Sequence, residues 1–177
     1  MVADCNFTVT PLPLVGISSC LVGNKVRYDG QHKFHSTVDE WIRPRVNLLP
    51  ICPESMAGMG IPRPPIELIK THHGIEARGR DNPTINVTNR IITMARAIAN
   101  SHPTLEGFIC QSRSPSCGFN TTPVFYRTAE GKQQASELGS GLFIQTLMQL
   151  LPHLVVVNEC DLDKSGSEAF LKQLKNN

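Results

Sequence analysis

Four short apolar runs constrain the fold of this chain more than any other feature. They span residues 14–19, 46–51, 105–110 and 153–158, and polar stretches with helical periodicity separate them. Apolar runs of this length are typical of strands that helices cover on both faces. Strands that alternate with helices favour a parallel arrangement. The pattern therefore predicts an α/β fold, a single Rossmann-like domain with a mostly parallel sheet flanked by helices.

The segments between these runs carry helix and turn signals. We expect helices at 36–42, from Asn82-Pro83 through 98, at 138–151 and at 165–174, and short extended pieces at 66–70, 74–78 and 124–126 beside a turn at Gly131. Asn82 followed by a proline is typical of a helix start. The irregular stretch 53–65 is of a length that usually serves function. One domain is expected over 1–177, with its core at about 14–158 and a C-terminal helix at 165–175.

The bulk composition narrows the classes of protein. The chain has 177 residues, 40% hydrophobic and 18% charged, with a net charge of +2. This small charge gives no sign of a DNA-binding surface. No apolar run reaches the length of a membrane span, and the N-terminus lacks the pattern of a secretory signal, so we expect a cytoplasmic protein without a membrane partner.

Three of the six cysteines occupy related positions. Cys20 and Cys52 follow the first two apolar runs, and Cys117 follows the third after a short polar loop. The carboxyl ends of parallel strands share one edge of a sheet, where ligands bind, so we expect these thiols to converge. Three sulfur ligands would leave a bound metal or cluster with an open position. Cys110 lies within a run and is expected to be a buried structural residue. We expect Cys5 and Cys160 to be structural residues as well.

Other polar residues accompany these thiols. Glu54 comes two residues after Cys52, and we predict that it acts as a general acid or base. Ser114 precedes Cys117 by three residues and is the second catalytic candidate, with Ser116 as the expected turn-stabilising serine.

Two basic segments complete the candidate site. Arg27, Tyr28 and Asp29 offer a cation, an aromatic ring and a carboxylate, a suitable wall for a planar heteroaromatic ligand; the alternative is a surface loop with an Arg27–Asp29 pair. Arg63 lies among prolines and is expected to bind an anion or to pair with Glu67.

These residues leave several functions open. The thiols suit an open-site iron–sulfur enzyme, a redox or electron-transfer module with Cys160 as fourth ligand, or a zinc-dependent hydrolase. A metal-free nucleotide-binding protein is a further alternative, although the chain lacks a G-x-G-x-x-G after its first apolar run.

The motifs together carry a resemblance. They are Ser19-Cys20-Leu21, Val26-Arg27-Tyr28-Asp29-Gly30, Cys52-Pro53-Glu54, Gly60-Ile61-Pro62-Arg63-Pro64-Pro65 and Ser114-Pro115-Ser116-Cys117-Gly118. Over about residues 14 to 158, the chain resembles the thiouracil desulfurase (TudS-like) family. The resemblance implies a 4Fe-4S cluster bound by Cys20, Cys52 and Cys117, with Glu54 and Ser114 as the catalytic pair.

The same resemblance implies a reaction. The iron without a protein ligand would bind the sulfur of a thiolated pyrimidine, and water would convert 4-thiouracil to uracil and hydrogen sulfide without net electron transfer. A free base, a thionucleoside and thiolated transfer RNA stay open as substrates.

Overall fold

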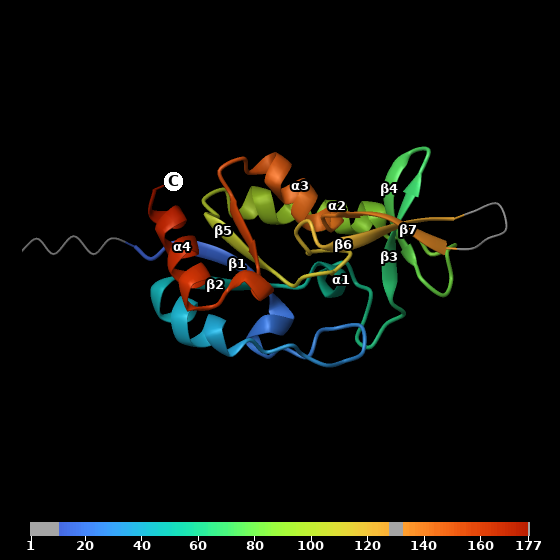
Figure 1. Ribbon diagram of the computed structural model, residues 1–177. Helices are drawn as coiled ribbons and strands as arrows, with labels where there is room; N and C mark the ends of the chain where they lie inside the picture. The colour runs from blue at the N-terminus through green and yellow to red at the C-terminus, as the bar shows by residue number, and fades with distance from the viewer. Residues whose placement is uncertain (1–10, 128–132, 177) are drawn as a thin grey trace, which may run out of the picture.

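The computed structural model describes residues 11–127 and 133–176. Its first sheet, sheet A, contains four parallel strands in the order β2-β1-β5-β8 (Figure 1). These are β1 (Leu14–Ser18), β2 (Asn47–Ile51), β5 (Gly107–Cys110) and β8 (Val155–Asn158). The α/β prediction with a mostly parallel, helix-flanked sheet is confirmed. Because Ser18 pairs with Ile51 and Cys110 with Asn158, the strands end at one common edge.

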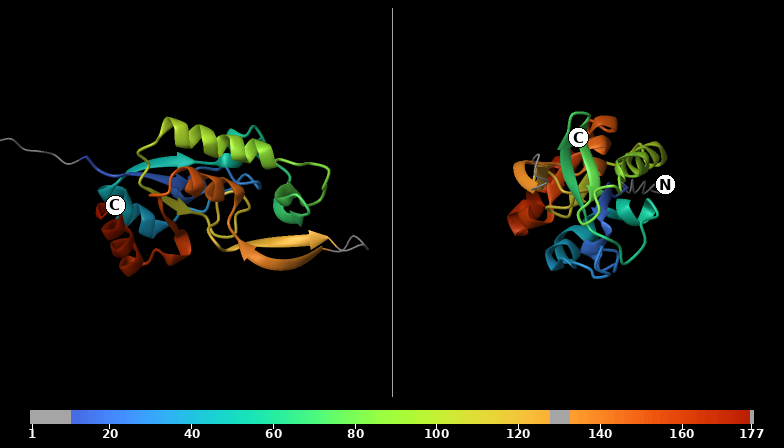
Figure 2. Two further views of the ribbon diagram at one scale, coloured as in Figure 1. Left: turned by 90° about the horizontal axis from the view of Figure 1, so that it is seen from above. Right: turned by 90° about the vertical axis from the view of Figure 1, so that its right-hand side faces the viewer.

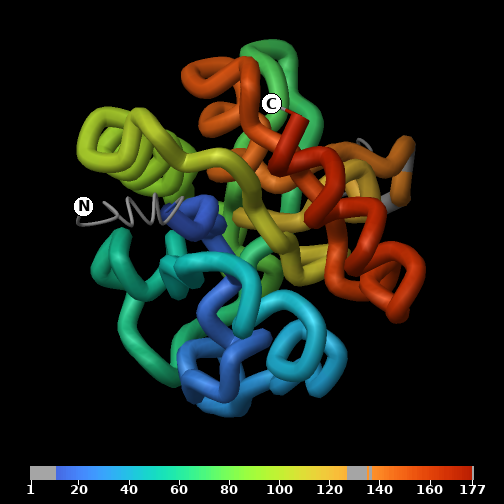
Figure 3. Tube along the Cα trace, turned by 90° about the vertical axis from the view of Figure 1, so that its left-hand side faces the viewer, coloured from blue at the N-terminus to red at the C-terminus, as the bar shows by residue number. Residues whose placement is uncertain are grey.

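Helices cover both faces of sheet A, as Figures 1 and 3 show. α2 (Thr88–Ser101) and α3 (Leu142–Leu150) pack on one face, where they share a core with Phe108 and Cys110. The other face is covered by α4 (Lys164–Lys175) and by the helical turn Val38–Ile42, which continues into a short turn at Arg43–Arg45. Phe108 and Ile109 belong to the two opposite cores, as the two-residue period of a strand requires.

The extended pieces expected at 66–70, 74–78 and 124–126 are strands, but their assembly into a second sheet, sheet B, was not predicted. Sheet B contains β3 (Ile66–Thr71), β4 (Gly74–Gly79), β6 (Thr122–Arg127) and β7 (Gln133–Gly139), in the order β4-β3-β6-β7. Only β3 and β6 run parallel; the two hairpins are antiparallel. Figure 2 shows β6 and β7 reaching away from sheet A. The two sheets share one core, since Leu68 and Val124 pack in the cluster that contains Phe108.

Two predicted helix starts are wrong. Leu138 and Gly139 end strand β7, and α3 begins only at Leu142. The reason is tertiary: Gly141 approaches the chain at Ser116 so closely that a Cβ atom there would lie 2.3 Å from a backbone carbon. Likewise Asn82 closes a turn by accepting from the Thr84 N–H at 3.1 Å, and α2 begins at Thr88. The turn expected at Gly131 lies outside the described residues.

Three short helical segments follow strands of sheet A directly. They are the 3-10 turn Ser19–Val22 after β1, α1 (Pro53–Met56) after β2, and the 3-10 turn Glu159–Asp161 after β8. Each places polar side chains beyond the carboxyl edge of the sheet. Within the described residues, no helix is long and apolar enough to cross a membrane.

Candidate functional site

A cavity of about 430 Å³ lies beyond the carboxyl edge of sheet A. All five residues predicted for cluster binding and catalysis line it: Cys20, Cys52, Glu54, Ser114 and Cys117. The carboxyl-edge rule for parallel sheets therefore accounts for where the cavity lies.

The three thiols each have polar neighbours. Ser18 Oγ donates to Cys117 Sγ at 3.0 Å, and Ser55 Oγ donates to Cys52 Sγ at 3.2 Å. The Cys20 thiol, which is buried, lies 3.9 Å from Gln111 Oε1. Donors directed at sulfur are a common way for proteins to stabilise cluster-bound thiolates.

The loop that carries Cys117 is held by α3. The amide of Leu142 donates to Pro115 O at 3.1 Å, and the amide of Phe143 donates to Ser116 O at 2.9 Å. Gly141 N–H donates to Gly118 O at 2.8 Å. The first N–H groups of a helix have no hydrogen-bond partner inside the helix. Here the carbonyls of the loop accept from these N–H groups, and the same hydrogen bonds fix the position of the loop.

Burial and mutual repulsion keep two of the thiols protonated. Burial, with a further contribution from the nearby Cys117, raises the pKa of Cys20 to about 12 against the opposing effect of Arg27. Burial also raises the pKa of Cys117 to about 11, although hydrogen bonds with Ser114 and Ser18 act to lower it. A cationic iron core that binds all three sulfurs would relieve this repulsion.

This donor set fits an iron–sulfur cluster. Among residues 11–127 and 133–176, no three His, Cys, Asp or Glu side chains are arranged to hold a single metal ion. A cubane cluster does not need such an arrangement, because each cysteine binds a different iron. Three thiols around one cavity, with hydroxyl donors at two of them, match that requirement.

Glu54 is held at both of its oxygens. Arg63 Nε donates to Oε2 at 2.8 Å, and Ser116 Oγ donates to Oε1 at 2.7 Å. Arg63 also donates to the carbonyls of Val26 and Gly60, both at 3.0 Å. Because the Arg63 guanidinium is itself almost fully buried, this is a desolvated pair with its hydrogen bonds satisfied.

These contacts correct two expectations. Arg63 pairs with Glu54, whereas Glu67 lies 3.8 Å from Arg80. The turn-stabilising serine is Ser114 rather than Ser116, because Ser114 Oγ accepts from the backbone N–H groups of Ser116 and Cys117 at 3.3 and 3.2 Å. The sequence offered no signal for the Ser116–Glu54 bond, since the two residues are 62 positions apart.

The three residues predicted to form a wall for a planar ligand do not all line the cavity. Arg27 and Tyr28 line the cavity, with the Arg27 guanidinium 5.6 Å from the centre of the Tyr28 ring. Asp29 is outside the lining; it lies 3.5 Å from Arg27 Nε and accepts from the Gln31 N–H at 3.0 Å. It therefore supports Arg27 from the solvent side.

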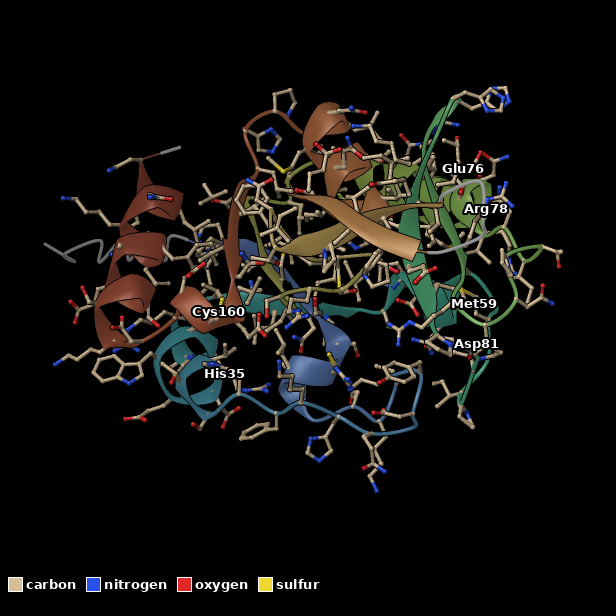
Figure 4. All side chains as sticks on the ribbon, turned by 45° about the vertical axis from the view of Figure 1, so that its right-hand side comes forward. His35, Met59, Glu76, Arg78, Asp81 and Cys160 are labelled. Atoms are coloured by element: carbon tan, nitrogen blue, oxygen red, sulfur yellow. The ribbon has the colours of Figure 1, made fainter. Side chains whose placement is uncertain are left out.

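The remaining described cysteines lie elsewhere. Cys110 is fully buried in β5, as predicted. Cys160 is exposed on the turn after β8 (Figure 4), 3.8 Å from Asp161 Oδ1. It does not line the cavity. Nothing in this placement supports Cys160 as a fourth ligand. Cys5 lies outside the described residues.

A family model described as 2-thiouracil desulfurase matches residues 15–159. The chain belongs to the 2-thiouracil desulfurase family. This membership confirms the predicted family and the prediction of an enzyme of the desulfurase class. The match covers every residue that lines the cavity.

Two relatives agree with this membership. The chain is 26% identical over 155 residues to the uncharacterized protein YbbK of Bacillus subtilis, a match that covers 82% of this chain and 97% of YbbK. A solved structure of the 4Fe-4S-dependent thiouracil desulfidase TudS is similar with a TM-score of 0.55 and 26% identity. That match covers 86% of this chain and 93% of TudS.

Proposed function

We propose that this enzyme hydrolyses the C–S bond of a thiolated pyrimidine, so that 4-thiouracil and water give uracil and hydrogen sulfide. The observation that carries the proposal is the convergence of Cys20, Cys52 and Cys117 with Glu54 and Ser114 on one cavity. Membership of the desulfurase family and the likeness to TudS support it.

Cys20, Cys52 and Cys117 would hold a 4Fe-4S cluster through their thiolates. When bound, such a cluster supplies a Lewis-acidic iron with affinity for sulfur. The overall reaction needs no oxidant or reductant, because one water provides the oxygen for the ring carbon and two hydrogens for the departing sulfur.

Glu54 is the proton carrier in this proposal. Its carboxylate accepts a proton from the water whose oxygen adds to the thiocarbonyl carbon, and then returns a proton to the departing sulfur. Arg63 and Ser116 fix the carboxylate in the cavity wall, so little reorganisation is needed during the reaction.

Ser114 and the Arg27 loop position the substrate. Ser114 Oγ accepts from two backbone N–H groups and lies 3.3 Å from Cys117 Sγ, so its own hydrogen can be donated to the Cys117 thiolate or to the charge that develops in the transition state. Arg27 and Tyr28 form the wall against which a planar ring can stack, and Asp29 holds Arg27.

The test is anaerobic reconstitution with iron and sulfide, followed by incubation with 4-thiouracil and, separately, 2-thiouracil. We expect loss of the near-ultraviolet absorption of the thiocarbonyl with release of one hydrogen sulfide per uracil formed. Parallel assays with 4-thiouridine and with transfer RNA that contains it compare the three substrate classes. A fully loaded protein that leaves every thiocarbonyl intact would contradict the proposal.

Cluster loading is expected to strengthen as the pH rises. At neutral pH, Cys20 and Cys117 carry protons because their pKa values are about 12 and about 11. Each must lose its proton to bind iron, so the apparent affinity rises up to about tenfold per pH unit for each proton displaced. Iron retention against a chelator, measured between about pH 6.5 and 8.5, tests this. Cys160→Ser is the matched control and should show the same slope; a flat profile would contradict the assignment.

A further inference from the structure

A buried carboxylate behind the cavity has no role in the reaction proposed above. Glu159 is 4% exposed and follows β8 directly. It accepts from Gln111 Nε2 at 2.7 Å, from Ser112 N at 2.6 Å, from Ser112 Oγ at 2.8 Å and from Lys33 Nζ at 3.2 Å. Burial acts to raise the pKa of Glu159, yet the bonds from Ser112 and Lys33 lower it overall. The carboxylate is therefore ionised and acts only as an acceptor.

This acceptor determines how the Gln111 amide is oriented. Nε2 donates to Glu159 Oε1 and also to Ser112 O, at 3.1 Å, so both amide hydrogens are used. The backbone is fixed too, because Gln111 N–H donates to Ser18 Oγ at 2.8 Å. The amide oxygen is left on the other side, 3.9 Å from Cys20 Sγ, and Gln111 lines the cavity.

The partner of this oxygen changes when the site is loaded. In the free protein the Cys20 thiol is the donor that lies near Gln111 Oε1. A Cys20 thiolate bound to iron has no hydrogen to donate. Gln111 is only 6% exposed, and a buried acceptor without a donor is costly. The loaded site therefore favours a ligand that brings an N–H group to this position.

We propose that Gln111 selects the substrate by accepting a hydrogen bond from the ring N–H beside the thiocarbonyl, with Glu159 as the residue that positions its amide. This inference rests on the proposed function and adds the feature of the substrate that is recognised. Free thiouracils, their nucleosides and their nucleotides all carry this N–H at position 3. A thiopyrimidine methylated at that nitrogen keeps the reactive C–S bond but loses the donor.

Two other side-chain acceptors in the cavity wall already have protein donors. Glu54 accepts from Arg63 and from Ser116. Ser114 Oγ accepts from two backbone N–H groups. Gln111 Oε1 differs, because its neighbour Cys20 would bind iron. When the cluster is bound, this oxygen loses its donor and becomes available to a ligand.

The experiment compares 4-thiouracil with 3-methyl-4-thiouracil on the loaded enzyme. We expect the wild type to favour 4-thiouracil by about 10- to 100-fold in kcat/KM, the cost of leaving a buried acceptor unpaired. Gln111→Met removes the acceptor while keeping the length of the side chain, so the preference should fall to less than about threefold. Gln145→Met, at an exposed position on α3, is the matched control and should keep the wild-type preference.

A second measurement does not depend on turnover. Calorimetry of the loaded protein with uracil and with 3-methyluracil should show the same preference in Kd, and Gln111→Met should abolish it. Glu159→Gln should weaken the preference for the unmethylated ring without removing iron. The neutral amide of the new glutamine can donate as well as accept, so it no longer fixes Gln111 with its oxygen toward the cavity.

The outcomes separate the two proposals. If Gln111→Met does not fold, the wild-type enzyme still tests the proposal. Equal kcat/KM values for the methylated and unmethylated substrates would contradict the role of Gln111. A Gln111→Met enzyme that keeps the full preference overturns it as well. If neither thiopyrimidine is desulfurated, the proposed function fails. A comparison of the Kd values of uracil and 3-methyluracil still tests whether Gln111 accepts a hydrogen bond from the ring N–H.

Discussion

Glu54→Gln is expected to lower kcat by about 10²- to 10⁴-fold while the protein keeps its full iron content. Glutamine preserves the shape of the side chain, so Arg63 and Ser116 keep a partner and the cavity wall is not emptied. An amide cannot accept a proton from water at neutral pH, and the loss should therefore appear in the chemical step. Single-turnover decay of 4-thiouracil on reconstituted protein measures this step directly.

The matched control for this variant is Glu137→Gln, at an exposed carboxylate on β7 that pairs with Lys70. It should retain the wild-type rate. A Glu54→Gln enzyme that turns over at more than about a tenth of the wild-type rate would remove Glu54 from the mechanism. A variant that also loses iron would indicate instead that Glu54 supports the cluster.

Cys52→Ser is expected to abolish both the cluster and desulfuration. Cys52 is the half-buried thiol at the start of α1, and Arg63, Ser55 and the Val26 carbonyl surround its sulfur. A hydroxyl is a poor ligand for iron in a sulfur-rich site, since soft thiolates are the ligands such clusters select. Two thiols would remain, too few to hold a cubane stably. Iron and sulfide analysis after anaerobic reconstitution, together with visible absorption, provides the measurement.

Two cysteines serve as controls here. Cys160→Ser should keep the cluster and the rate, because Cys160 is exposed and does not line the cavity. Cys110→Ala should cost stability, because Cys110 is fully buried, yet leave the iron content unchanged. A cluster lost with Cys160→Ser but retained with Cys52→Ser would reverse the ligand assignment and revive the electron-transfer alternative.

Several parts of this enzyme were predictable from local chemistry. The four apolar runs became the four strands of sheet A, because short buried strands must be apolar on both faces. Cys20, Cys52 and Cys117 were expected at one edge for a topological reason, and they line one cavity there. Gln111 and Glu159 follow β5 and β8 directly, so the same rule would have found them had it been applied to every strand end.

Other parts were decided only when distant segments met. The start of α3 depends on how closely Gly141 approaches Ser116, a contact between segments 25 residues apart that no local propensity records. Sheet B depends on the parallel pairing of β3 with β6, two strands whose partners lie more than 50 residues away in the chain. The sequence likewise suggested an anion or Glu67 as the partner of Arg63, and packing placed Glu54 there instead.

The sequence by itself therefore determined which polar side chains and thiols lie beyond the carboxyl edge of the sheet, because strand polarity and alternation are local properties. Only the tertiary structure decided which oxygen faces which hydrogen. Glu54 is held between Arg63 and Ser116, and the Gln111 amide is oriented by Glu159, through hydrogen bonds that depend on angles and on distances near 3 Å. Such geometry arises when separate elements pack, and it cannot be inferred from spacing along the chain.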